Sequence, residues 1–213
     1  LTTHPAELYG VAERIGKVEQ GADADLVVWD GNPLTLTAAV NLVFIDGELA
    51  FENGQAIKAP VKLSARPEAA PSPSVPTQSP RGESPVALER SVDSTVLVRA
   101  RKVYTVSGEA LEPGQILIRS GKIVQLGKRI DIDKNAPGLQ VIDVPGTVCP
   151  GLIDAGSGLG VSGRRADEFR EMTPGLPVLL ASDLGTSDRR AALRGGVTVA
   201  AVTPGDRLSL IHI

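Results

Sequence analysis

Apolar residues recur along this chain in short runs with the two-residue alternation of β-strands, and turn residues separate the runs. Asp46-Gly47 and Ser120-Gly121 each stand between two such runs, which is a strong hairpin signal. The pattern therefore predicts a mainly β protein. Strands are expected at residues 24–29, 40–45, 48–51, 95–106, 114–119, 122–126, 141–144, 147–153 and 197–203.

Two segments have helical signals instead. Residues 2–10 read as a short helix that Thr3 or His4 precedes, with Pro5 in its first turn and Gly10 as its stop. Residues 187–194 read as a second helix, which Thr186 or Ser187 caps and Gly195-Gly196 ends. The apolar run that follows is typical of a buried parallel strand, so an α/β pattern begins at this end of the chain.

One stretch lacks the composition of a folded segment. Proline, serine and alanine dominate residues 64–85, and large apolar residues are nearly absent. Such a stretch buries too little surface to offset its ordering entropy. We expect a linker over residues 63–90; a proline-rich binding motif is the alternative.

Composition narrows the classes of partner. Hydrophobic residues make up 42% of the chain, the formal charge is −3, and aromatic residues are only 3%. These values give no argument for nucleic-acid or membrane binding, and no apolar run reaches the roughly 18 residues of a membrane span. A soluble protein is expected, cytoplasmic or periplasmic. The single cysteine, Cys149, excludes an internal disulfide and is interpreted as a buried structural thiol.

The two ends of the chain carry separate expectations. Residue 1 is leucine, so the start of the reading frame is expected upstream. Residues 208–213 resemble the translation of a sequencing-adapter end, and an ordinary short apolar strand is the alternative. His212 lies in this segment, which would leave His4 as the one native histidine of the chain.

Residues 1–51 resemble the C-terminal end of amidohydrolase-superfamily enzymes, especially the imidazolonepropionase-like and dihydroorotase-like branches. The matching positions are Pro5-Ala6, Gly10, Ile15-Gly16, Gly21 and Ala24-Asp25-Leu26-Val27-Val28. Their content is structural: glycines suit hairpins, and the apolar run suits a strand of a small β-sandwich. A turn or cap role is expected for Asp25.

Residues 95–205 resemble the N-terminal end of the same superfamily. The matching positions are Gly121-Lys122-Ile123, Asp143, Gly146, Val148, Pro150-Gly151-Leu152-Ile153-Asp154 and Arg194-Gly195-Gly196-Val197-Thr198. The part that resembles a C-terminal end therefore precedes the part that resembles an N-terminal end. A fusion of two consecutive modules explains this order. The resemblance implies a composite β-sandwich plus an incomplete (β/α) TIM-barrel fragment.

The resemblance divides the chain into five parts. Residues 1–62 are the last helix and sandwich strands of one module, and residues 63–90 are the linker. Residues 91–149 are the first sandwich strands of a second module, residues 150–207 begin its barrel, and residues 208–213 are the adapter-like end. We expect the two sandwich halves to pair, because each alone leaves strand edges and an apolar face open. The barrel fragment cannot close, since a barrel needs eight strands.

The same resemblance determines what is expected of the metal site. In the family, Asp154-Ala155 would be followed by His-x-His at the end of the first barrel strand, where two imidazoles can share one metal. Here Gly156, Ser157 and Gly158 stand in its place. We therefore assign no catalytic, cofactor-binding or metal-binding residue to the chain, although the intact family uses zinc or another divalent metal. Weak binding of a hard cation by Asp154, Ser157, Asp167 and Glu168 is the alternative.

Two further patterns are weighed against ordinary explanations. Residues 158–163 match G-x-G-x-x-G, and Asp183 lies at the distance expected of a dinucleotide site. The following residues give no convincing apolar helix face and Pro150 interrupts the preceding strand, so turn glycines are favoured. His4, alone at a helix start, is interpreted as a solvated or capping residue.

These observations favour a fragment of a tandem amidohydrolase-like protein. The parent family hydrolyses non-peptide C–N bonds of small-molecule amides, and the fragment itself is expected to be inactive. The alternative is a non-catalytic pseudoenzyme or scaffold module, and a nucleotide-binding module is the third hypothesis. A homo-oligomer of the intact protein is left open.

Overall fold

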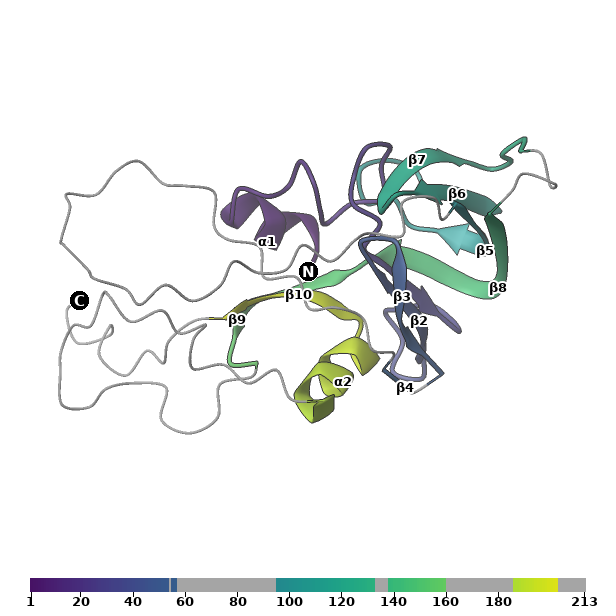
Figure 1. The fold of residues 1–213 in the computed structure, drawn as a ribbon. Coiled ribbons are helices and arrows are strands. Elements are labelled where there is room, and N and C mark those ends of the chain that lie inside the picture. Colours follow the sequence, from purple (N-terminus) through teal and green to yellow (C-terminus); the bar gives the residue numbers. More distant parts are fainter. Residues whose placement is uncertain (54, 57–94, 133–137, 160–185, 203–213) are drawn as a thin grey trace, which may run out of the picture.

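A computed structural model describes residues 1–53, 55–56, 95–132, 138–159 and 186–202. The expected linker and the adapter-like end lie outside these residues. Figure 1 shows a mixed β-sheet with a small strand–helix–strand unit at one side. The elements are α1 (Thr3–Leu8), β1 (Leu26–Trp29), β2 (Val40–Ile45), β3 (Glu48–Glu52), β4 (Gln55–Ala56), β5 (Thr95–Val103), β6 (Gly114–Arg119), β7 (Lys122–Gly127), β8 (Leu139–Pro150), β9 (Leu152–Ser157), α2 (Thr186–Arg194) and β10 (Val197–Val202).

Strands from both sides of the linker form a single eight-stranded sheet, in the order β4-β3-β2-β1-β8-β5-β6-β7. We call residues 1–56 the tail segment and residues 95–157 the head segment. They meet where β1 pairs antiparallel with β8, with Val27 opposite Cys149. On its other side β8 pairs parallel with β5. The expected pairing of the two halves is confirmed, and the chain is mainly β.

The sheet curls until distant strands meet. The Asp46-Gly47 turn joins β2 to β3, and the Ser120-Gly121 turn joins β6 to β7 at the other end of the strand order. Nevertheless a Cβ built on Gly121 would lie 2.7 Å from the Asp46 carbonyl oxygen. Both turns have positive φ at both central residues, as type I′ hairpins require. The two predicted hairpins are therefore confirmed, and their turns are packed against each other.

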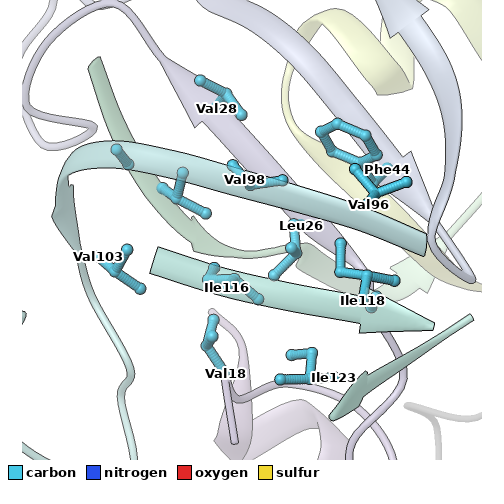
Figure 2. Packing of buried hydrophobic residues seen from close by; sticks show 13 residues of the cluster. Val18, Leu26, Val28, Phe44, Val96, Val98, Val103, Ile116, Ile118 and Ile123 are labelled. Atoms are coloured by element: carbon cyan, nitrogen blue, oxygen red, sulfur yellow. The ribbon is translucent and has the colours of Figure 1, made fainter. Parts of the chain in front are cut away.

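Curling creates one large core between the tail and head segments (Figure 2). Leu26 and Phe44 of the tail segment belong to the same buried cluster as Val98, Ile116 and Ile123 of the head segment. These five residues come from five different strands of the curled sheet, and each is essentially inaccessible to solvent. Burial of each such side chain contributes roughly 1.5–3 kcal/mol to the stability of the fold. Because the buried side chains come from both segments, neither segment can form this core alone.

The structure differs from the sequence prediction at β8. Residues 141–144 and 147–153 were expected as two strands, but residues 139–150 form one strand, and the next strand starts at Leu152. Gly146 keeps the strand continuous, because a Cβ at this position would lie 1.8 Å from the Trp29 carbonyl oxygen of β1. The strand predicted over 95–106 ends earlier, at Val103, and Val106 has a positive φ of 66°.

β9, α2 and β10 form the small unit at the side of the sheet. β9 and β10 pair in parallel, which confirms the strand–helix–strand pattern expected at this end of the chain. The short helix α1 contacts β9, and the Tyr9 hydroxyl donates a hydrogen bond to the Ala155 carbonyl oxygen. Thr3 or His4 was expected to precede α1, but the helix begins at Thr3, so both residues lie in its first turn and Thr2 is the N-cap.

Candidate functional site

The end of β9 is where the resemblance would place metal ligands. β9 passes between β10 and the first residues of the chain: the Ile153 amide donates to the Leu1 carbonyl oxygen. Asp154 is opposite Ala200 in the parallel pair, and its side chain is exposed. Its Oδ1 accepts a hydrogen bond from the Gly156 amide at 3.3 Å, so this carboxylate partly caps the turn that follows.

The three residues that replace the expected His-x-His differ in their surroundings. A Cβ at Gly156 would meet no atom within 4 Å, so a side chain at this position would have room. Ser157 is buried, and its Oγ accepts a hydrogen bond from the Leu159 amide at 3.1 Å. Ser157 is thus used in a local turn, and Gly156 provides no donor atom.

A shallow depression of about 330 Å³ adjoins this strand end. Its lining includes two carboxylates, Asp154 and Asp188, together with Ser157. Among the described residues no group of three or more His, Cys, Asp or Glu side chains is placed to hold a metal ion. The side chains present here do not fit a family-type divalent ion, which needs several convergent ligands. Asp167 and Glu168, the other two members of the weak cation site considered above, lie outside the described residues.

Other candidate residues are scattered. The His4 side chain is 95% exposed and lies 3.6 Å from the Glu7 carboxylate, one helical turn away. Residues 160–163 of the G-x-G-x-x-G pattern, Asp183 and His212 lie outside the described residues. No described helix is long and apolar enough to cross a membrane.

Cys149 lies on β8 within a buried apolar cluster, as expected of a structural thiol. Burial raises the pKa of the Cys149 thiol to about 11, and a hydrogen bond from the Trp29 indole N–H at 3.2 Å offsets part of this rise. A thiol with such a pKa stays protonated at neutral pH, so it is a poor nucleophile and a poor metal ligand.

Asp25 supports a turn, which agrees with the role expected for it. Its Oδ1 accepts a hydrogen bond from the Asp46 amide at 2.8 Å, at the start of the Asp46-Gly47 turn. Burial raises the pKa of the Asp25 carboxyl to about 6, and the Asp46 hydrogen bond opposes this rise. The Asp25 carboxyl thus lies beside the Asp46-Gly47 turn, and it does not line the depression at the end of β9.

Asp23 is a buried charge that sequence reasoning missed. It is 4% exposed, and it pairs with Arg14 at 2.8 Å and with Lys122 of the head segment. An isolated β-bridge joins Asp23 to Lys122 as well. Nothing local in the sequence marks this contact, because Lys122 follows a hairpin turn far along the chain.

The described residues fold into a curled mixed sheet, and its strand β8 leads directly into a parallel strand–helix–strand unit. The sequence model of the amidohydrolase family matches residues 1–51. The chain is 31% identical to amidohydrolase tasK of Hapsidospora irregularis over 227 aligned positions, covering 96% of this chain and 21% of that protein. It is 28% identical to protein unc-33 of Caenorhabditis elegans over 80 positions, covering 28% of this chain and 9% of that protein. No solved structure matches.

The tail segment therefore matches the amidohydrolase family, and nearly the whole chain is similar to one long amidohydrolase. It spans about a fifth of the length of the fungal amidohydrolase that it matches. That match runs through both the tail and the head segments, so the long relative has the same order of segments.

Proposed function

We propose that this chain is the junction between two amidohydrolase-like modules of a tandem protein. In this proposal residues 1–62 end an upstream module, residues 63–90 link it to the next, and residues 91–149 and 150–207 begin a downstream module. The composite sheet is the sandwich of the family, and β9, α2 and β10 are the start of a TIM barrel. The match to one long amidohydrolase across nearly the whole chain supports this assignment.

The downstream module acts as a non-catalytic scaffold, and the segment itself hydrolyses nothing. The observation that carries this proposal is the end of β9: Gly156 stands in open space where the family would have an imidazole, and Ser157 is engaged in a turn. Any hydrolysis of small-molecule C–N bonds by the parent protein then belongs to the upstream module, with zinc or another divalent ion.

Metal analysis of the complete downstream module tests the proposal. We expect less than about 0.1 equivalent of zinc after purification in zinc-containing buffer, because first-strand imidazoles are missing. A double variant with Gly156→His and Gly158→His should raise the zinc content measurably, and Gly156→Ala serves as the control that changes the backbone without adding a ligand. One equivalent of tightly held zinc in the unmodified module would refute the scaffold role.

The alternative is that the downstream module keeps a catalytic role through a cation held differently. The two carboxylates Asp154 and Asp188 at one depression favour it. Isothermal titration with Mg²⁺, Mn²⁺ and Zn²⁺ separates the two functions: the alternative requires saturable binding that Asp154→Asn abolishes, and the scaffold role requires none.

A further inference from the structure

We infer that consecutive modules of the parent protein are interlocked, because the tail segment of the upstream module occupies the open edge of β8 in the downstream module. This inference rests on the proposed tandem organisation. In a protein whose modules were independent, the edge of β8 would be filled by the downstream module's own tail. The contacts within this chain assign that edge to the preceding tail.

The first support is hydrogen bonding of the main chain. β1 pairs with β8 over residues 26–29 and 147–150, and the Gly151 amide donates to the Asp25 carbonyl oxygen just beyond the strand. On the opposite side of the curled sheet, the Ala24 amide donates to the Gly121 carbonyl oxygen, and Gly21 and Ile123 contribute further main-chain bonds. The tail segment thus contacts the head segment along two separate lines.

The second support is close steric fit. A Cβ on Gly146 would collide with the Trp29 carbonyl oxygen, and a Cβ on Gly47 would lie 2.9 Å from the Ile118 side chain. In each case a glycine of one segment allows the other segment's chain to approach. Close packing of this kind favours this tail segment over an arbitrary β-strand at the edge of β8.

The third support is charge. Asp23 of the tail segment is almost completely buried, and Lys122 of the head segment neutralises it together with Arg14. A buried carboxylate without partners is costly, so this arrangement favours a head segment with a cation at position 122.

The fourth support is the length of the connection. Residues 57–94 separate Ala56 of β4 from Thr95 of β5. Because only these 38 positions join the two segments, their pairing is intramolecular, which raises the effective concentration of one segment for the other. The downstream module's own tail is synthesised only after that module's complete barrel. The preceding tail is therefore the first to reach the β8 edge during synthesis.

The native Cys149 provides a direct test. Val27 is opposite Cys149 in the β1–β8 pair, and both side chains belong to the same buried cluster. A Val27→Cys variant therefore places two thiols on neighbouring strands within the reach of a disulfide. Val43→Cys is the matched control: Val43 is opposite Val27 on the far side of β1, about 10 Å from Cys149 and beyond that reach.

Each variant is made both in the full-length tandem protein and in the 213-residue chain. Both proteins carry a protease site inserted between residues 64 and 85. They are produced in cells with an oxidising cytoplasm, where the disulfide can form. After cleavage, non-reducing gels show whether the two pieces stay joined. Interlocked modules give joined pieces for Val27→Cys, separate pieces for Val43→Cys, and separation of all pieces after reduction.

Two results would overturn the inference. If Val27→Cys joins the pieces of the 213-residue chain but not those of the tandem protein, the downstream tail displaces the upstream one. If it joins neither while circular dichroism shows both proteins folded, the β1–β8 pairing is absent. Zinc content is measured on the same samples, so a failed scaffold assignment is recognised independently of the disulfide result.

Discussion

At the scale of single residues, two buried titratable groups lie beside the junction of the tail and head segments. Asp25 and Cys149 have pKa values raised chiefly by burial, and neither has the neighbours of a catalytic group. Perturbed pKa values often mark active sites, but structural burial perturbs them too. Here the hydrogen-bond partners, a hairpin amide for Asp25 and an indole for Cys149, indicate structural roles.

Asp25 makes a specific prediction about pH. Because its pKa is about 6 in the folded chain against an ordinary 3.8, the folded state binds more protons than the unfolded state between about pH 4 and pH 6. This group therefore stabilises the fold at acid pH relative to neutral pH, and its contribution falls as the pH rises through 6. We expect Asp25→Asn to remove a dependence of order 1–3 kcal/mol from the free energy of unfolding between pH 4.5 and pH 8.

Urea unfolding at both pH values measures this difference. The exposed Asp131→Asn is the control that removes a carboxylate without removing a buried one. If the wild-type chain and Asp25→Asn lose the same free energy of unfolding between the two pH values, the carboxyl is not buried as described.

Cys149 should resist alkylation while the chain is folded. With a pKa near 11, roughly one thiol in a thousand is ionised at pH 8, and the side chain is 7% exposed. In a Leu36→Cys variant, iodoacetamide at pH 8 should add one label to the folded chain and two in urea, because Leu36 is fully exposed. Mass spectrometry reads the result, and rapid labelling of Cys149 in the folded wild-type chain would contradict the structure.

At the scale of elements, the two hairpins were predictable and their contact was not. Asp-Gly and Ser-Gly between apolar runs specify type I′ turns through local backbone preference alone. Pro145-Gly146, in contrast, read as a break in the sequence, yet β8 continues through it because β1 passes close to Gly146. The short helix α2 and strand β10 were found because caps and a continuous apolar run are also local signals.

Gly121 should be the most sensitive glycine of the three described here, because it combines a positive φ with a close neighbour. Gly121 has φ of 80° and almost touches Asp46, Gly10 has φ of 67° with open space around it, and Gly31 has neither constraint. We expect Gly121→Ala to lower the free energy of unfolding by about 2–4 kcal/mol, Gly10→Ala by about 1 kcal/mol, and Gly31→Ala by less than about 0.5 kcal/mol. Chemical denaturation of the three variants measures this ranking, and equal values would disprove the contact between the turns.

At the scale of the whole molecule, the sequence predicted which halves meet but not how they are held. The resemblance implied two sandwich halves, each of which alone would leave an apolar face and a strand edge uncovered. The register between β1 and β8, and the ion pairs of Asp23, depend on residues that are far apart in the chain and carry no local signature. The candidate site was predictable only as a replacement, Gly156 for an expected ligand; the turn made by Ser157 required coordinates.

The Asp23–Lys122 pair should stabilise the union of the two segments. Lys122→Glu would place a carboxylate beside a carboxylate that is only 4% exposed, and we expect a loss of about 1–3 kcal/mol in the free energy of unfolding. Lys128→Glu makes the same charge change at an exposed position and should cost less than about 0.5 kcal/mol. Urea titration in low and high salt compares them; similar losses would show that Lys122 does not matter to the junction.

The pairing of Trp29 with a strand 120 positions later has a consequence for the ribosome. At roughly 5–20 residues per second, β1 emerges about 6–24 seconds before its partner has been translated. Throughout that interval a wholly apolar strand waits with one edge unsatisfied, which is the circumstance in which nascent chains recruit chaperones or associate with one another.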